Sequence, residues 1–181
     1  HKRAEEEVLA KQELFQKTFD ISPLPSVLSK LPERTIVDVN PAFEKLFEYT
    51  RAEMIGKSVA EFDLWADVSE RQRVAEVLIK SGSVHDYEFV FKTKSGETGY
   101  GIFYSETIQQ LADKYVLTKV MNITERKQAE RALRESEERF RRALENIPDV
   151  IVIYDRDLRI QYINEATLQV TGRPISDPLK I

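Results

Sequence analysis

Ile36-Val-Asp-Val-Asn-Pro-Ala-Phe43 (IVDVNPAF) is the most informative stretch of the sequence. Its first half is rich in β-branched apolar residues, which predicts a short strand over Arg34–Val39. Asn40 can accept a hydrogen bond from a free N–H of a first helical turn, and Pro41 suits the first helical position, where no donor is needed. The stretch therefore predicts a strand that runs directly into an Asn-capped helix.

The same pattern occurs twice in the chain. A charged helix containing Ala4 is followed by a break at Pro23, and a second charged helix containing Ala129 is followed by a break at Pro148, at a constant offset of 125 residues. At an offset of 124 residues, the strand–Asn–helix pattern recurs around Asn164. A period this long indicates a domain duplicated in tandem, since solenoid repeats are much shorter.

Between the two charged helices the sequence predicts mixed α and β structure. A first strand precedes Pro32, and two further helices begin at the capping residues Thr50 and Asp67. The last of these helices is expected to turn Val74, Ala75, Val77 and Leu78 inward. From Asp86 the apolar period becomes two, which predicts three strands. They are Asp86–Thr93, Gly99–Ile108 and Tyr115–Met121. This order predicts an α+β fold, a five-stranded antiparallel sheet with helices on one face.

Each charged helix is amphipathic and carries a heptad-like apolar seam of the kind found in coiled coils. In the second helix the seam positions alternate in steps of four and three, with Glu, Arg and Lys around them. Either the helices pair in a homodimer, or each lies on its own domain. For the homodimer, the predicted seam residues are Val8, Phe15, Ala129, Leu133, Phe140 and Ala143.

Composition excludes several classes of function. The net charge of the 181-residue chain is −4, and Lys and Arg alternate with Glu rather than forming a basic face, which argues against binding to nucleic acid. No apolar run approaches the roughly 18 residues that a membrane span needs, so we expect no membrane contact in this segment. Cysteine is absent, which excludes disulfides and Cys-based metal sites and fits a cytoplasmic location.

The sequence offers no catalytic constellation. His85 is the only internal histidine and is expected in the turn before a strand. A hydrolase triad of Ser83, His85 and Asp86 is disfavoured because these residues are adjacent in sequence, whereas triads converge from separate elements. A metal site at His85 lacks a second soft ligand. We therefore expect no enzymatic activity, no catalytic residue and no metal site in this segment.

The ordered set of short motifs resembles a PAS domain. These motifs are Ile36–Phe43, Glu53-Met-Ile-Gly56, Leu64-Trp65-Ala-Asp67 with Arg71, Tyr87-Glu88, Lys94-Ser-Gly-Glu97 and Asn122-Ile-Thr-Glu-Arg-Lys127. The resemblance covers about residues 15–127, and again about residues 138–175. It implies an amphipathic helix at 1–19, a complete PAS-like sensor at 20–124, a helical connector at 125–147 and the start of a second, truncated copy at 148–181. Such segments typically occur in bacterial sensor histidine kinases and in cyclic-di-nucleotide enzymes, upstream of further signalling domains of the same chain.

The resemblance also implies a hinge that relays the signal into the connector. Its residues here are Asn122, Ile123, Thr124, Arg126 and Lys127. The family usually has Asp where this chain has Asn122, and Asn keeps a hydrogen bond but loses the charge pairing with Arg126 or Lys127. Thr124 is expected to cap the connector helix. The tail Pro178–Ile181 departs from the family pattern.

The family's cofactors can be tested against the residue types present. Haem is disfavoured because Glu70–Lys80 contains no His, and a flavin adduct is disfavoured because there is no Cys. The cofactor therefore stays unknown: a non-covalent flavin, a small apolar ligand, or a filled core in a ligand-free dimerisation spacer are all open. The residues that would line the pocket or fill the core are Phe43, Leu46, Phe47, Met54, Leu64, Trp65, Leu78, Phe89, Phe91 and Ile102.

Overall fold

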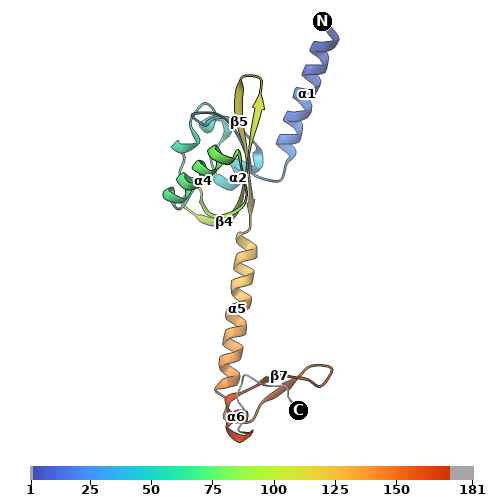
Figure 1. The fold of residues 1–181 in the computed structure, drawn as a ribbon, viewed down its shortest axis with the longest axis vertical. Helices are drawn as coiled ribbons and strands as arrows, with labels where there is room; N and C mark the ends of the chain where they lie inside the picture. The colour runs from blue at the N-terminus through green and yellow to red at the C-terminus, as the bar shows by residue number, and fades with distance from the viewer. Residues whose placement is uncertain (1, 172–181) are drawn as a thin grey trace. The chain divides into compact units, whose positions relative to one another are not determined.

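A computed structural model describes residues 2–171, and of residues 2–5 and 8 the backbone alone. The side chain of the seam residue Val8 is thus not among those described. The tail Pro178–Ile181 lies outside the described residues. The chain divides between Glu125 and Arg126 into two compact units, which are described separately (Figure 1). Among the helices within residues 2–171, none has the length and apolar character that crossing a bilayer requires.

The first unit is an α+β fold around a five-stranded antiparallel sheet, as predicted, with strand order β2-β1-β5-β4-β3. Helices α2 and α4 lie on one face of this sheet (Figure 1). The strands are β1 (Ser26–Lys30), β2 (Thr35–Val39), β3 (Ser83–Lys92), β4 (Thr98–Gln110) and β5 (Asp113–Asn122). The helices are α1 (Lys2–Ile21), α2 (Pro41–Phe47), α3 (Arg51–Met54), the 3-10 helix η1 (Val59–Glu61) and α4 (Val68–Ser81).

The predicted helix starts are confirmed by the local hydrogen bonds. Asn40 caps α2, and Thr50 caps α3 through a reciprocal capping box with Glu53. Asp67 caps α4, which ends at Gly82 in the left-handed conformation with φ of 80°. Each cap satisfies N–H groups that have no partner within the helix.

Two sequence predictions about the core are wrong. Val77 on α4 is 51% exposed, since only Val74 and Leu78 of this helix turn fully inward. Ile102 lies on the face of β4 opposite to its core face, because the alternation of this strand buries Gly101 and Phe103 instead. Phe103 therefore takes the core position that was expected for Ile102.

The start of β3 also differs from the prediction. The strand begins at Ser83, so His85 lies within a strand and not in a turn. The register shifts between Val84 and Tyr87, where Asp86 has a φ of 52°. This bulge breaks the period-two pattern, which is why the sequence placed the start of the strand at Asp86.

The side chain of Asn40 connects three elements of the first unit. It is fully buried, and its Oδ1 accepts hydrogen bonds from the N–H groups of Ser26 at 2.8 Å and Phe43 at 2.9 Å. Its Nδ2 donates to the carbonyl oxygens of Phe19, Ser22 and Leu24 at 3.2, 3.2 and 2.9 Å. One amide thus joins the end of α1, the start of β1 and the first turn of α2.

The second unit repeats this arrangement around Asn164. Its elements are α5 (Thr124–Glu145), β6 (Val152–Tyr154), β7 (Ile160–Ile163) and α6 (Glu165–Thr171). Oδ1 of Asn164 accepts from the N–H groups of Ile151 at 3.0 Å and Thr167 at 3.2 Å. Its Nδ2 donates to the carbonyl oxygens of Leu144, Ile147 and Asp149 at 3.4, 3.1 and 2.8 Å. Each of these partners lies 124 or 125 residues after the corresponding partner of Asn40, the same offsets as in the sequence repeat.

We predict that Asn40→Ala destabilises the first unit by about 2–4 kcal/mol, because it removes the five hydrogen bonds of a buried amide to the backbone. Urea unfolding followed by the fluorescence of Trp65, the one tryptophan of the chain, measures this loss. Asn164→Ala is the matched control, since it removes the equivalent amide from the other unit. Equal unfolding midpoints for Asn40→Ala and the wild type would contradict this role.

Candidate functional site

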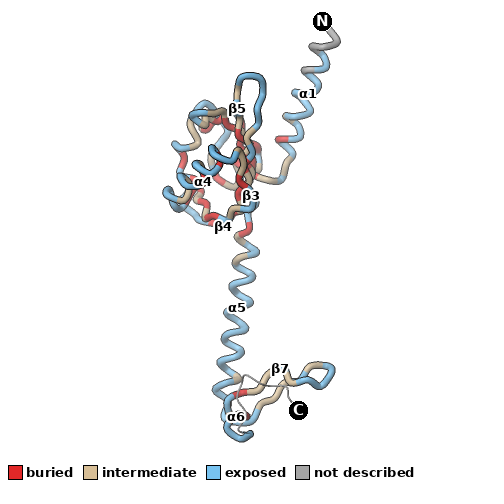
Figure 2. Tube along the Cα trace, viewed as in Figure 1, coloured by how far each residue is buried: buried red, intermediate tan, exposed pale blue. Residues whose placement is uncertain are grey.

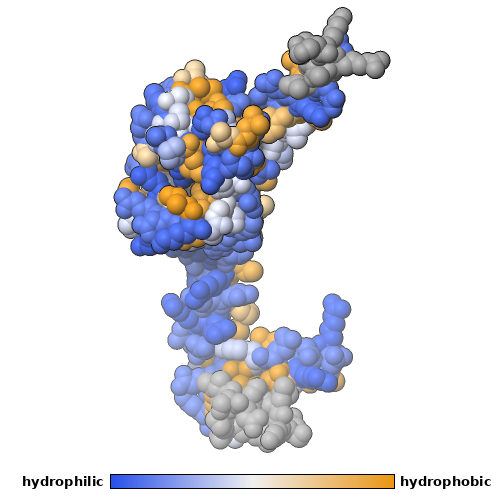
Figure 3. All heavy atoms as spheres, turned by 45° about the horizontal axis from the view of Figure 1, so that its top comes forward, coloured by the Kyte–Doolittle hydropathy of each residue, from blue (hydrophilic) through white to orange (hydrophobic). Residues whose placement is uncertain are grey.

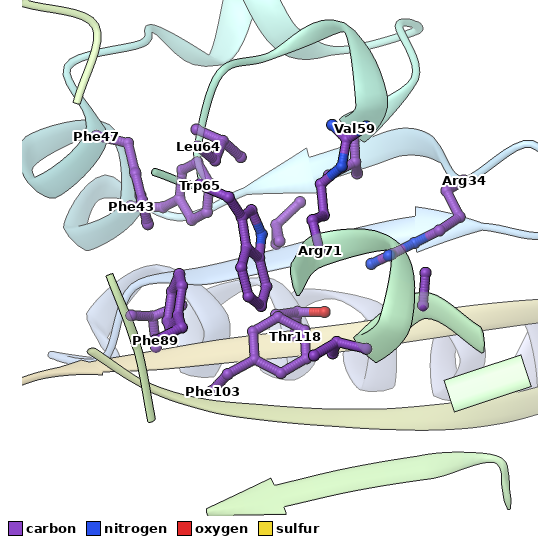
Figure 4. Close-up of a pocket in the computed structure, with 14 residues that line it drawn as sticks. Arg34, Phe43, Phe47, Val59, Leu64, Trp65, Arg71, Phe89, Phe103 and Thr118 are labelled. Atoms are coloured by element: carbon purple, nitrogen blue, oxygen red, sulfur yellow. The ribbon is translucent and has the colours of Figure 1, made fainter. Parts of the chain in front are cut away.

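A small cavity of about 40 Å³ lies between the core face of the sheet and the helices of the first unit (Figure 4). Of the ten residues predicted to line a pocket or fill the core, five line this cavity. They are Phe43, Phe47, Leu64, Trp65 and Phe89. Met54, Leu78 and Phe91 are buried in the surrounding core, and Leu46 packs against it partly exposed. We call this cavity, with its lining residues, the aromatic pocket.

Three rings from three elements form one wall of the aromatic pocket. Trp65 packs against Phe89 of β3, with ring centroids 4.3 Å apart, and against Phe103 of β4 at 5.5 Å. Phe89 and Phe103 meet edge to face at 5.9 Å. Trp65 therefore contacts core rings of both β3 and β4.

Sequence reasoning missed two charged residues of the pocket lining, Arg34 and Arg71. Arg34 follows the turn between β1 and β2 and has a φ of 57°, a conformation that no periodic pattern signals. Burial, and then the charge of Arg71, lower the pKa of Arg34 from its usual value. A guanidinium remains charged at neutral pH even so, so the two half-buried arginines give the pocket lining positive charge.

Two glycines of β4 make room for the rings of β3. A β-carbon at Gly101 would lie 2.8 Å from Cε1 of Phe89. A β-carbon at Gly99 would overlap the ring of Phe91 and would lie 2.6 Å from Oγ1 of Thr124. Gly99 therefore lies next to both a core aromatic ring and the first residue of α5.

The residues Asn122, Ile123 and Thr124 form the exit corner between β5 and α5. Oγ1 of Thr124 accepts a hydrogen bond from the N–H of Tyr100 on β4 at 2.9 Å, and Ile123 donates its N–H to the Tyr100 carbonyl at 2.9 Å. Oδ1 of Asn122 accepts from the N–H of Thr124 at 3.0 Å. The side chain of Ile123 is buried. The corner is thus bonded to β4 as well as to β5.

The predicted capping role of Thr124 stays a prediction. Thr124 is the first residue of α5, and its hydroxyl accepts a hydrogen bond from the neighbouring strand β4. Asn122 provides the side-chain acceptor for the start of this helix. Of the two basic hinge candidates, Arg126 pairs with Glu130 one turn further along at 3.6 Å, and Lys127 follows it in α5.

His85 takes part in a surface pair rather than in a triad. Its Nε2 contacts a carboxylate oxygen of Glu106 on β4, while Asp86 accepts a hydrogen bond from the hydroxyl of Tyr104. Within the described residues, no group of three or more His, Asp or Glu side chains is placed to hold a metal ion.

The described seam residues of the flanking helices lie on the surface. Leu133 and Phe140 of α5 are 62% and 61% exposed, and Ala129 and Ala143 are exposed as well. On α1, Phe15 is 49% exposed and stacks on Phe19. Figure 2 shows α5 exposed along nearly its whole length, and Figure 3 shows hydrophobic atoms gathered along one side of it.

Comparisons with known proteins give matches in sequence and in fold. A family model described as a PAS domain matches residues 24–125, and a second PAS domain model matches residues 138–180. Sporulation kinase E of Bacillus subtilis (strain 168) is 27% identical over 176 residues, covering 97% of this chain. The chain spans 23% of the length of that kinase.

Solved structures show the same fold at low sequence identity. A PAS domain from a two-component sensor histidine kinase matches with a TM-score of 0.55 at 12% identity, covering 64% of this chain and 98% of that one. A PAS domain of the fruit-fly ELK potassium channel matches with a TM-score of 0.53 at 20% identity, covering 62% and 97%. An RNA-binding light-oxygen-voltage receptor matches with a TM-score of 0.58 at 20% identity, covering 70% and 37%.

We predict that Gly99→Ala destabilises the first unit by about 1–3 kcal/mol, because the added methyl group meets Phe91 and Thr124. Urea unfolding followed by Trp65 fluorescence measures the loss. The same substitution in a Phe91→Leu background should cost less, since the shorter side chain vacates the space at the end of the ring. Strictly additive losses in this double-mutant cycle would show that the ring does not constrain position 99.

Proposed function

Because this chain belongs to the PAS domain family, we propose that it is the signal-sensing and relay segment of a larger bacterial signal-transduction protein, a sensor histidine kinase. The similarity to sporulation kinase E supports this assignment. In this proposal the aromatic pocket receives the signal, the exit corner passes it to α5, and catalysis belongs to other domains of the parent protein. The Asn122–Lys127 segment is the hinge.

The observation that carries the proposal is the contact of the exit corner with β4 beside Gly99. Phe91 and Thr124 approach this glycine from the two sides of the relay, the core and the helix start. Tyr100, the next residue, bonds to the Thr124 hydroxyl. A shift of the core rings that moves β4 therefore also moves the first turn of α5.

The relay needs two packings of similar free energy. If they differ by a few kcal/mol, a signal that favours one packing by a comparable amount changes the populations decisively. Two phenylalanines over glycine positions suit this requirement, because small ring movements there are not blocked by β-carbons on β4.

The C-terminal end of α5 is hydrogen-bonded to the second PAS match through Asn164, just as the end of α1 is hydrogen-bonded to the first through Asn40. Asn164 accepts N–H groups of the second unit and donates to the carbonyl of Leu144 in the last turn of α5. A rotation or displacement of α5 would then act on the backbone around Asn164. We therefore assign α5 the role of connector between two PAS copies.

We further propose that the segment is a homodimer joined through its flanking helices. On α5, the pairs Arg126–Glu130, Arg131–Glu135 and Arg134–Glu138 stabilise the helix along its polar side. The exposed Leu133 and Phe140 lie on the apolar side, and pairing with the same helix of a second copy would bury them.

The size of the cavity separates the candidate ligands. Pockets for drug-sized ligands and organic cofactors usually measure roughly 300–1,000 Å³, whereas the aromatic pocket measures about 40 Å³. This difference disfavours a non-covalent flavin. A very small ligand, or a ligand-free spacer with a filled core, fits the observed volume.

To test the relay, we predict that Thr124→Val increases the hydrogen-exchange rates of the Tyr100 amide and of residues 126–130 by roughly tenfold. This factor corresponds to the loss of one hydrogen bond of about 1.4 kcal/mol. Thr124→Ser, which keeps the hydroxyl, should exchange like the wild type. Faster exchange at Tyr100 with an unchanged α5 would mean that the exit corner does not couple the sheet to the helix.

A further inference from the structure

Arg34 directs its guanidinium into the aromatic pocket from the edge of the sheet (Figure 4). Its backbone is held in place because its carbonyl accepts a hydrogen bond from the N–H of Val59 at 3.1 Å. Among the described side chains, three buried polar atoms have no hydrogen-bond partner, and Nε of Arg34 is the one that belongs to a charged group. The side chain is thus oriented toward the cavity without a protein acceptor for this N–H.

The charge around Arg34 is uncompensated. Arg71 is the other charged residue in the described lining, which includes no acidic residue. Arg71 donates from Nη1 to the carbonyl of Ala60 at 3.2 Å, so it binds backbone and not a carboxylate. Partly burying a charge without an acidic partner is unfavourable, and two arginines at one cavity add mutual repulsion. The pocket therefore has the electrostatics of a binding site for an anion.

We propose that the aromatic pocket binds a small monocarboxylate, whose oxygens accept hydrogen bonds from Arg34 and whose short apolar part contacts Trp65 and Phe103. This inference deepens the proposed sensing function and rests on it, since it names the class of ligand that the sensor recognises.

The chemistry of the pocket favours a carboxylate over other anions. A guanidinium presents parallel N–H donors that match the two oxygens of a carboxylate. Apart from the arginines, the lining is almost entirely apolar and aromatic, and its one hydroxyl, that of Thr118, already bonds to Ser105. Phosphate or sulfate would turn unpaired oxygens toward the rings, whereas a methyl or ethyl group suits them.

The cavity volume limits the length of the ligand. A single water needs about 10–15 Å³ measured in the same way, so about 40 Å³ holds a few heavy atoms. Acetate and propionate are of this size. Since Trp65 also contacts Phe89 and Phe103, a ligand beneath it acts on β3 and on β4, the strand to which the exit corner is hydrogen-bonded.

The test is a titration of the whole chain with sodium acetate and sodium propionate at constant ionic strength, followed by Trp65 fluorescence. We expect a saturable change for the wild type that sodium chloride and neutral acetamide do not produce. Arg34→Met should weaken the binding at least tenfold. Arg73 is an exposed arginine on α4 that does not line the aromatic pocket, so Arg73→Met should bind like the wild type.

Thermal unfolding provides a second readout. Without carboxylate, Arg34→Met should melt at or above the wild-type temperature, because it removes a half-buried charge without an acidic partner, and acetate should raise the melting temperature of the wild type alone. Arg34→Lys keeps the charge without the planar fork and should bind with intermediate affinity. Equal responses to acetate and chloride, unchanged binding by Arg34→Met, or a Met variant that melts well below the wild type would overturn the proposal.

Failure of this site and failure of the relay give different results. Saturable binding that leaves hydrogen exchange in α5 unchanged upholds the carboxylate site and contradicts the relay. Absence of binding overturns the carboxylate site, while the Thr124 substitutions still decide whether the exit corner couples the sheet to α5.

Discussion

The buried side-chain amide of Asn40 is the interaction on which the first unit depends most. It bonds to backbone groups at the end of α1, the start of β1 and the first turn of α2, and so fixes where the flanking helix meets the sheet. Asn164 makes the corresponding bonds in the second unit. Unpaired buried polar groups cost free energy comparable to a whole hydrogen bond, so each junction has one favourable geometry. A helix that enters a PAS copy in this way cannot shift without disturbing the core behind it.

At its other end the first unit is joined to α5 through the exit corner, whose contacts differ from those of Asn40. The exit corner bonds to β4 at Tyr100, next to a glycine over which the Phe91 ring lies. The absence of a β-carbon at Gly99 lets the Phe91 ring and the Thr124 hydroxyl both approach this position closely. One end of the proposed relay is therefore held by the hydrogen bonds of a buried amide, and the other combines hydrogen bonds to β4 with close packing at Gly99. This combination suits a module that holds its helices firmly yet responds to changes of packing, and the uncompensated charge of Arg34 supplies a reason for such a change.

Local chemistry made much of the fold predictable. Asn40-Pro41, the acid–cap spacing at Thr50 and Asp67, and the period of two after Asp86 each correspond to an observed element, because caps and alternation act within a few residues. The errors arise where tertiary structure decides. The bulge near Asp86 interrupts the alternation of β3, so the pattern did not reveal that His85 lies within this strand. The alternation of β4 buries Phe103 and not Ile102. The pocket role of Arg34 was not predicted because an arginine beside a turn is usually a surface residue. Only the folded chain shows its guanidinium at the pocket.

The proposed relay requires that the packing of the aromatic pocket determines how α5 pairs with a second copy. The chain contains no cysteine, so single cysteines introduced at Phe140, on the seam, or at neighbouring Arg141 report pairing through their rates of oxidative cross-linking. We predict rapid cross-linking at position 140, slow cross-linking at 141, and a ratio that changes several-fold when Phe89→Leu loosens the pocket. Equal rates at the two positions, or a ratio unaffected by Phe89→Leu, would contradict the account.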